Sequence, residues 1–225
     1  MNDFILPQAS LFLGIIPALI LLYISLKGYE GYYKDKNIFL TFVIGIIVGF
    51  ISALMEIFTI SVGLLFIILF PIFEQLFKTI ILNVGRLQEK RETVVYGLSL
   101  GLGFGSIFTP LSLIVANIQT VETSLIVSVI IGSIGIILFH GATGTLIGYG
   151  IHTGKLSKYF ILAVLLHLPV TGWFFLTDYY DVEYLQVGLI LYGLIIYWYA
   201  TKKIMPRILS QSQRKKRSKK EVEVK

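Results

Sequence analysis

Long apolar runs alternate along the chain with short polar segments. A helix needs about 20 mostly apolar residues to cross the hydrocarbon core of a bilayer. On that measure the pattern predicts seven transmembrane helices, near residues 8–26, 38–58, 60–84, 94–116, 124–151, 159–177 and 184–200. The predicted fold class is therefore all-α, a polytopic membrane helical bundle.

Composition supports an integral membrane protein over a soluble domain, because 56% of the 225 residues are apolar and only 14% are charged. The sequence predicts a single transmembrane helical domain over residues 1–203 and a basic cytoplasmic tail over residues 204–225. The first apolar run follows a segment without positive charge, so we expect a retained helix rather than a signal peptide. The chain has no cysteine, which excludes disulfides and thiolate metal sites.

Basic residues are distributed asymmetrically between the two sets of loops. Eighteen of the 19 Lys and Arg residues lie in the loops after the first, third and fifth spans or after the seventh, and the other loops have none. The positive-inside rule then places the N-terminus outside and the C-terminus in the cytoplasm. We expect a multi-pass protein of a prokaryotic plasma membrane. The tail, with RKKRSKK at 214–220, is expected to contact anionic lipid headgroups and not nucleic acid.

Four ionisable residues lie deep inside the apolar runs, away from their ends: Glu74, Lys78, His140 and His167. A charged side chain at the centre of a membrane helix costs about 3 kcal/mol or more, so such residues usually mark a functional site. At 1.5 Å per residue, Glu74 and His140 each lie roughly 16 Å from the inner end of their span, and His167 roughly 12 Å. We therefore expect Glu74, His140 and His167 to share one layer of the bundle.

Each of these residues also has a structural interpretation. Glu74 and Lys78, four residues apart, can form a neutral pair along one helix face. Each histidine can be a hydrogen-bonded core residue, and Glu56 and His152 are expected to be solvated at the membrane interfaces. Glycines at three- and four-residue spacing predict close helix packing, with room for a substrate or water as a compatible alternative. These glycines are Gly97, Gly101 and Gly105 in the fourth span, and Gly141, Gly144 and Gly148 in the fifth.

The segment Pro71-Ile-Phe-Glu74-Gln75-Leu-Phe-Lys78 resembles the P-x-x-E-E-x-x-K/R motif of PrsW-type intramembrane proteases, in the group that contains the CAAX proteases and bacteriocin-immunity-type membrane proteases. Three further segments resemble the family's later motifs in the same order, over about residues 70–172. They are Tyr96-Gly97 with Gly101-Leu-Gly-Phe104, then 139–150 around His140, and Leu166-His167.

The resemblance implies that Glu74 is a general base or a metal ligand, and that His140 and His167 bind a metal or stabilise an oxyanion. Four positions depart from the family pattern, with Gln75 and Phe108 replacing glutamates, and Thr109 and Thr171 replacing asparagines. Gln75, Lys78, Phe108 and Thr171 are expected to support the site.

Two chemistries remain open for this set. One carboxylate and two imidazoles are a common ligand set for catalytic zinc, with a fourth position open to water. Alternatively, Glu74 activates water directly while Gln75 hydrogen-bonds a substrate carbonyl. The expected activity is an intramembrane endopeptidase that cleaves a membrane protein or peptide. The alternatives are a non-catalytic scaffold that binds another protein's transmembrane segment, and a small transporter or proton-coupled channel.

Overall fold

The computed structural model describes residues 5–59, 63–85, 87–88, 90–115, 123–180 and 187–210. These residues form α-helices and no strand. The helices are α1 (Ile5–Leu26), α2 (Asp35–Thr59), α3 (Leu64–Leu82), α4 (Thr93–Gly105), α5 (Phe108–Val115), α6 (Thr123–His152), α7 (Leu156–Tyr180) and α8 (Val187–Tyr199). A π-helical turn (Ala200–Ile204) and a 3₁₀ turn (Met205–Ile208) continue α8.

Five helical segments are long and apolar enough to cross a membrane: Asp35–Thr59, Leu65–Leu82, Thr93–Val115, Val127–His152 and Leu156–Thr177. A shorter apolar helix covers Ser10–Leu26, and α8 is also apolar. With α4 and α5 counted together, the described residues give seven apolar segments at the predicted places. The all-α membrane-type bundle is thus confirmed; the orientation of its ends remains a prediction.

The fourth predicted span is two helices rather than one, because α4 ends at Gly105 and α5 begins at Phe108. Proline has no N–H, and its ring clashes with the carbonyl four residues earlier. Pro110 therefore prevents a regular helix from continuing through Ser106. The Ser106 hydroxyl instead donates to the Gly103 carbonyl, 2.7 Å away.

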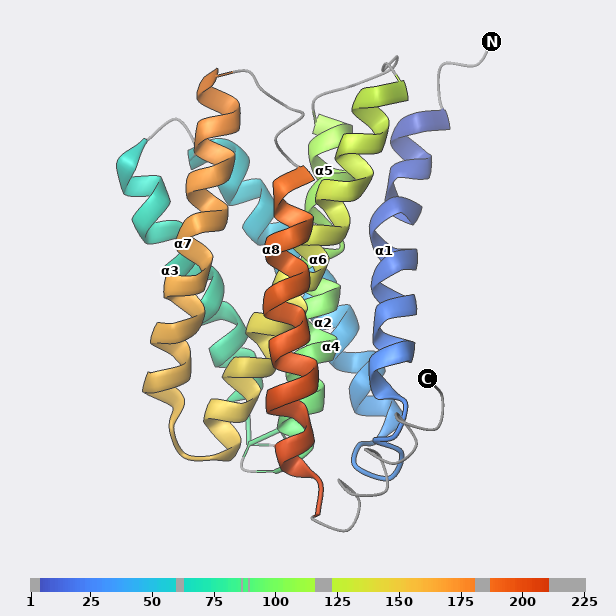
Figure 1. The fold of residues 1–225 in the computed structure, drawn as a ribbon, viewed down its shortest axis with the longest axis vertical. Coiled ribbons are helices and arrows are strands. Elements are labelled where there is room, and N and C mark those ends of the chain that lie inside the picture. The colour runs from blue at the N-terminus through green and yellow to red at the C-terminus, as the bar shows by residue number, and fades with distance from the viewer. Residues whose placement is uncertain are drawn as a thin grey trace.

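Helix α4 is the centre of the bundle, and every one of its residues is buried. Its glycines allow neighbouring backbones to approach closely. A Cβ on Gly97 would collide with the Gly144 carbonyl of α6, and one on Gly103 with the Phe42 carbonyl of α2. The packing interpretation of the glycine spacing is therefore confirmed. Figure 1 shows α3 and α7 along one side of the bundle and α1 along the other.

The packed part of the chain extends beyond residue 203, where the sequence predicts the tail to begin. Ile204, Met205, Ile208 and Leu209 are all buried in hydrophobic clusters. Helical structure therefore continues to Ile208, and the packed domain extends at least to Leu209.

Candidate functional site

Helix α3 carries its polar residues on the face that turns into the bundle. Glu74, Gln75 and Lys78 are fully buried, whereas Phe73 and Leu76 are 45% and 39% exposed. An inward polar face is the arrangement expected in lipid, where ionisable groups are stabilised only by other protein groups. The polar residues of α3 therefore depend on partners from other helices.

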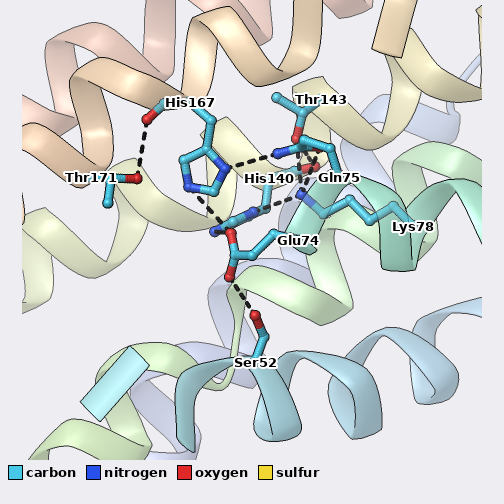
Figure 2. Close-up of polar contacts among 8 residues, drawn as sticks. All are labelled: Ser52, Glu74, Gln75, Lys78, His140, Thr143, His167 and Thr171. Atoms are coloured by element: carbon cyan, nitrogen blue, oxygen red, sulfur yellow. Dashed lines mark hydrogen bonds and ion pairs between the residues drawn. The ribbon is translucent and has the colours of Figure 1, made fainter. Parts of the chain in front are cut away.

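Glu74 meets two histidines from separate helices, as Figure 2 shows. One ligand atom from each of Glu74, His140 on α6 and His167 on α7 lies within 4.8 Å of the other two. All three side chains are at most 3% exposed. The expectation that these residues share one layer and converge is confirmed.

The two oxygens of the Glu74 carboxylate have different surroundings. Oε1 accepts a hydrogen bond of 2.7 Å from the Ser52 hydroxyl on α2. Oε2 lies 3.2 Å from His167 Nε2 and 3.9 Å from His140 Nε2. Neither contact is a well-formed hydrogen bond, and Oε2 has no such partner within the described part of the chain.

Lys78 does not form the predicted contact with Glu74. Its Nζ atom instead lies 2.8 Å from His140 Nδ1, 3.0 Å from Thr143 Oγ1 and 3.4 Å from Gln75 Oε1. It also lies 4.6 Å from the centre of the Phe104 ring, which is a cation–π distance. The intrahelical pair is replaced by bonds that join α3 to α6.

Gln75 holds the second imidazole. Its Nε2 lies 2.9 Å from His167 Nδ1, while its Oε1 faces the Lys78 ammonium. One amide thus connects α3 to α7 and at the same time contacts Lys78.

Aromatic rings cover the histidines from several sides. The Phe108 ring stacks on His140, with centroids 5.1 Å apart at 19°, and Phe104 lies 4.9 Å from the same imidazole. Phe139 packs against both His140 and His167, at 5.3 and 4.9 Å. Phe108 therefore borders the site as expected, as an apolar wall and not as a ligand.

Thr171 does not contact the other polar groups. Its hydroxyl donates to the His167 carbonyl on its own helix, 3.4 Å away. The backbone next to His167 is held from α8, because the Tyr192 hydroxyl donates to the Leu166 carbonyl at 2.6 Å. Pro169 removes one N–H from this part of α7, where a bond from another helix helps to fix the chain.

The structure adds Ser52, Thr143 and Tyr192 to the residues that the sequence suggested. Serine and threonine hydroxyls within helices commonly bond to their own backbone, and the last apolar run holds several tyrosines, so nothing in the sequence distinguished these three. Glu56 was expected to be solvated, but it is partly buried and interacts electrostatically with Glu74.

The spacing of the ligand atoms means that Glu74, His140 and His167 could hold a metal ion. The same set can also act without one, because it brings a carboxylate acceptor and two imidazoles together in a water-poor interior. Comparison of the chain with protein-family models, with curated proteins and with solved structures found no match. The resemblance to PrsW-type proteases therefore remains a prediction from the residues alone.

Proposed function

We propose that the protein is an intramembrane endopeptidase in which Glu74 is the general base. The observation that carries the proposal is Oε2 of Glu74, a buried carboxylate oxygen without a hydrogen-bond partner among the described residues. An unsatisfied buried group costs about 1–3 kcal/mol and calls for an explanation such as catalysis. A base awaiting a water molecule is such an explanation.

In the proposed reaction, Oε2 of Glu74 takes a proton from water, and the water oxygen bonds to the carbonyl carbon of the peptide. The two imidazoles beside Oε2 are placed to donate to the carbonyl oxygen as it becomes negative. Glu74 then gives the proton to the amide nitrogen as the carbon–nitrogen bond breaks.

A membrane protein or peptide is the proposed substrate. The site is closed, since Glu74, His140 and His167 are at most 3% exposed, so a substrate enters only when helices separate. Helix α3 lies at the side of the bundle and presents apolar residues outward, including Leu69 at 45% and Ile80 at 57% exposure. A transmembrane segment would meet a compatible surface there.

A non-catalytic scaffold is the second candidate. Phe108, which stacks on His140, favours it, because the resembled family has a glutamate at this position. In this case the same closed polar cluster would stabilise the fold, and the outer surface of α3 would bind a partner's transmembrane segment.

Substitution of Glu74 by Gln tests the proposal. General acid–base groups contribute about 100-fold to 10,000-fold, so Glu74→Gln should lower peptide cleavage in proteoliposomes at least 100-fold. A pool of transmembrane peptides serves as substrate, and new termini are read by mass spectrometry. Glu30→Gln makes the same change at an exposed residue and should cleave like the wild type.

Thermal unfolding in detergent must accompany the assay, because Glu74→Gln removes a buried charge one helical turn from Lys78. Unchanged cleavage by a folded Glu74→Gln protein would rule out Glu74 as the base. Absence of cleavage by the wild type, together with retained binding of a transmembrane segment, would support the scaffold.

A further inference from the structure

The surroundings of Lys78 match the three N–H groups of an ammonium. Gln75 Oε1 has no hydrogen to give, so Lys78 donates to it. The Thr143 hydroxyl donates its hydrogen to the His140 carbonyl, 3.1 Å away. Its oxygen is therefore the acceptor in the contact with Lys78. The third and shortest contact is to His140 Nδ1, at 2.8 Å. With Lys78 as an ammonium, which can only donate, Nδ1 of His140 is the acceptor of this contact.

The proton of His140 must then lie on its other nitrogen. A neutral imidazole has one donor and one acceptor, and the group that bonds to one nitrogen fixes the state of the other. With Nδ1 accepting from Lys78, His140 carries its hydrogen on Nε2, which faces Glu74 Oε2 at 3.9 Å.

The same argument applies to His167. Lys78 fixes the orientation of the Gln75 amide by binding its oxygen, so the NH₂ group points at His167 Nδ1, 2.9 Å away. His167 therefore also carries its hydrogen on Nε2, facing Glu74 Oε2 at 3.2 Å.

These proton positions do not fit a metal centre. A histidine ligand binds metal through a nitrogen without a proton, and its other nitrogen donates to a carboxylate, carbonyl or water. Here the nitrogens that face Glu74 carry the protons, and the outer partners, Lys78 and Gln75, are donors. The spacing of the heavy atoms allows a metal ion, but the hydrogen-bond partners of both imidazoles oppose one.

We infer that the centre works without a bound metal, with Lys78 and Gln75 as positioning residues that keep the hydrogen of both imidazoles on Nε2, on the side of Glu74 but outside hydrogen-bond geometry with its Oε2. The ammonium of Lys78 supplies the positive charge that a metal would otherwise bring. The catalytic role of this arrangement rests on the proposed function, whereas the proton positions and the lack of metal affinity do not.

Metal content and histidine tautomers test the inference without an activity assay. Purified wild-type protein is incubated with excess zinc and then desalted. It should retain well below one zinc ion per chain, as measured by inductively coupled plasma mass spectrometry. Nitrogen NMR of ¹⁵N-histidine-labelled protein should show His140 and His167 with the hydrogen on Nε2, assigned by His140→Gln and His167→Gln. One tightly held equivalent of zinc, or Nδ1–H signals from these residues, would overturn the inference.

A double variant of Gln75 and Lys78 should increase the affinity of the site for a metal ion. Gln75→Glu places an acceptor at His167 Nδ1, and Lys78→Met removes the donor at His140 Nδ1. Outer partners alter metal affinity by about 10–100-fold, so the double variant should bind zinc or cobalt at least 10-fold more tightly than the wild type. Gln88→Glu with Lys90→Met makes the same changes outside the site and should have no effect.

Thermal unfolding shows whether the double variant is folded, and if it is not, Gln75→Glu alone is measured in the same way. No gain in affinity by a folded variant would contradict the assigned role of Lys78 and Gln75. Wild-type protein that lacks metal, shows the expected tautomers and cleaves nothing would refute the proposed function and leave this inference intact.

Discussion

Glu74 and Lys78 lie one turn apart on α3, yet their closest partners belong to other helices. The carboxylate receives a hydrogen bond from Ser52 and lies beside two imidazoles, while the ammonium contacts Thr143 and His140. Burial of unpaired charge in a membrane is costly, and each contact lowers that cost by bringing a donor to an acceptor. The charged groups thus join α2, α3, α6 and α7 in one network.

Ser52 is predicted to stabilise the Glu74 carboxylate directly. A hydrogen bond to a charged group contributes about 1.5–3 kcal/mol, so Ser52→Ala should lower the free energy of unfolding by about that amount. Thermal or denaturant unfolding in detergent measures the change. Ser112→Ala is the matched control, because the Ser112 hydroxyl donates to the Phe108 carbonyl of its own helix and the residue is exposed. An equal loss in both variants would contradict the role of Ser52.

The sequence predicted which ionisable residues meet but not which atoms bond. Glu74, His140 and His167 stand out because charged and imidazole groups are rare at membrane depth, and their distance along each helix places them in one layer. The partner of Lys78 could not be predicted, because an i, i+4 pair on one helix competes with acceptors on a neighbour. Only the packing of α3 against α6 decides that competition.

At the scale of the helices, close contact between α4 and α6 fixes the position of His140. A Cβ on Gly101 would collide with the His140 carbonyl, and a Cβ on Gly144 would collide with the Gly97 carbonyl. Small residues of this kind let membrane helices pack through their backbones. The glycines therefore bring His140 to its place beside α3, although none of them takes part in the polar contacts.

Gly144→Ala is expected to destabilise the bundle, since the backbone carbonyl it meets cannot move aside as a side chain could. Overpacking of this kind costs about 1–3 kcal/mol, and it should lower the melting temperature in detergent. Gly172→Ala is the control, because a Cβ there has nothing within 4 Å. It should leave the melting temperature unchanged or raise it slightly. A tolerated Gly144→Ala would show that the contact between α4 and α6 adapts more easily than the structure indicates.

Helix positions follow closely from the apolar pattern, whereas the interruption between α4 and α5 does not. The run over 94–116 is apolar throughout, and hydropathy alone does not register the effect of Pro110 on the carbonyl of Ser106. Proline also lies inside α3 and α7 without dividing either helix. Whether a proline kinks or ends a helix depends on whether neighbouring groups can hydrogen-bond to the backbone carbonyl that the proline leaves unpaired.

At the scale of the whole molecule, the basic loops gather at one end. The backbone N–H of Lys34 and the Asn37 amide both donate to the Tyr96 hydroxyl, which joins the start of α2 to the start of α4. Gly148, near the end of α6, packs against Thr93 at that same start. Figure 1 shows the α1–α2 and α6–α7 connections and the end of α8 at this end of the bundle. The described loops rich in Lys and Arg therefore share one face of the membrane-type bundle.

That arrangement makes the predicted orientation testable. If the basic end is cytoplasmic, as the positive-inside rule predicts, a reporter fused after Lys225 should be active in the cytoplasm. A reporter inserted near Asp181, between the sixth and seventh predicted spans, should be active only outside. A paired phosphatase and fluorescent-protein assay distinguishes the two locations, and a fusion in the 153–155 connection serves as a second cytoplasmic control. Reporters at Lys225 and Asp181 on the same side would mean that α8 does not cross the membrane. Both reporters on reversed sides would place the basic loops outside and refute the assignment.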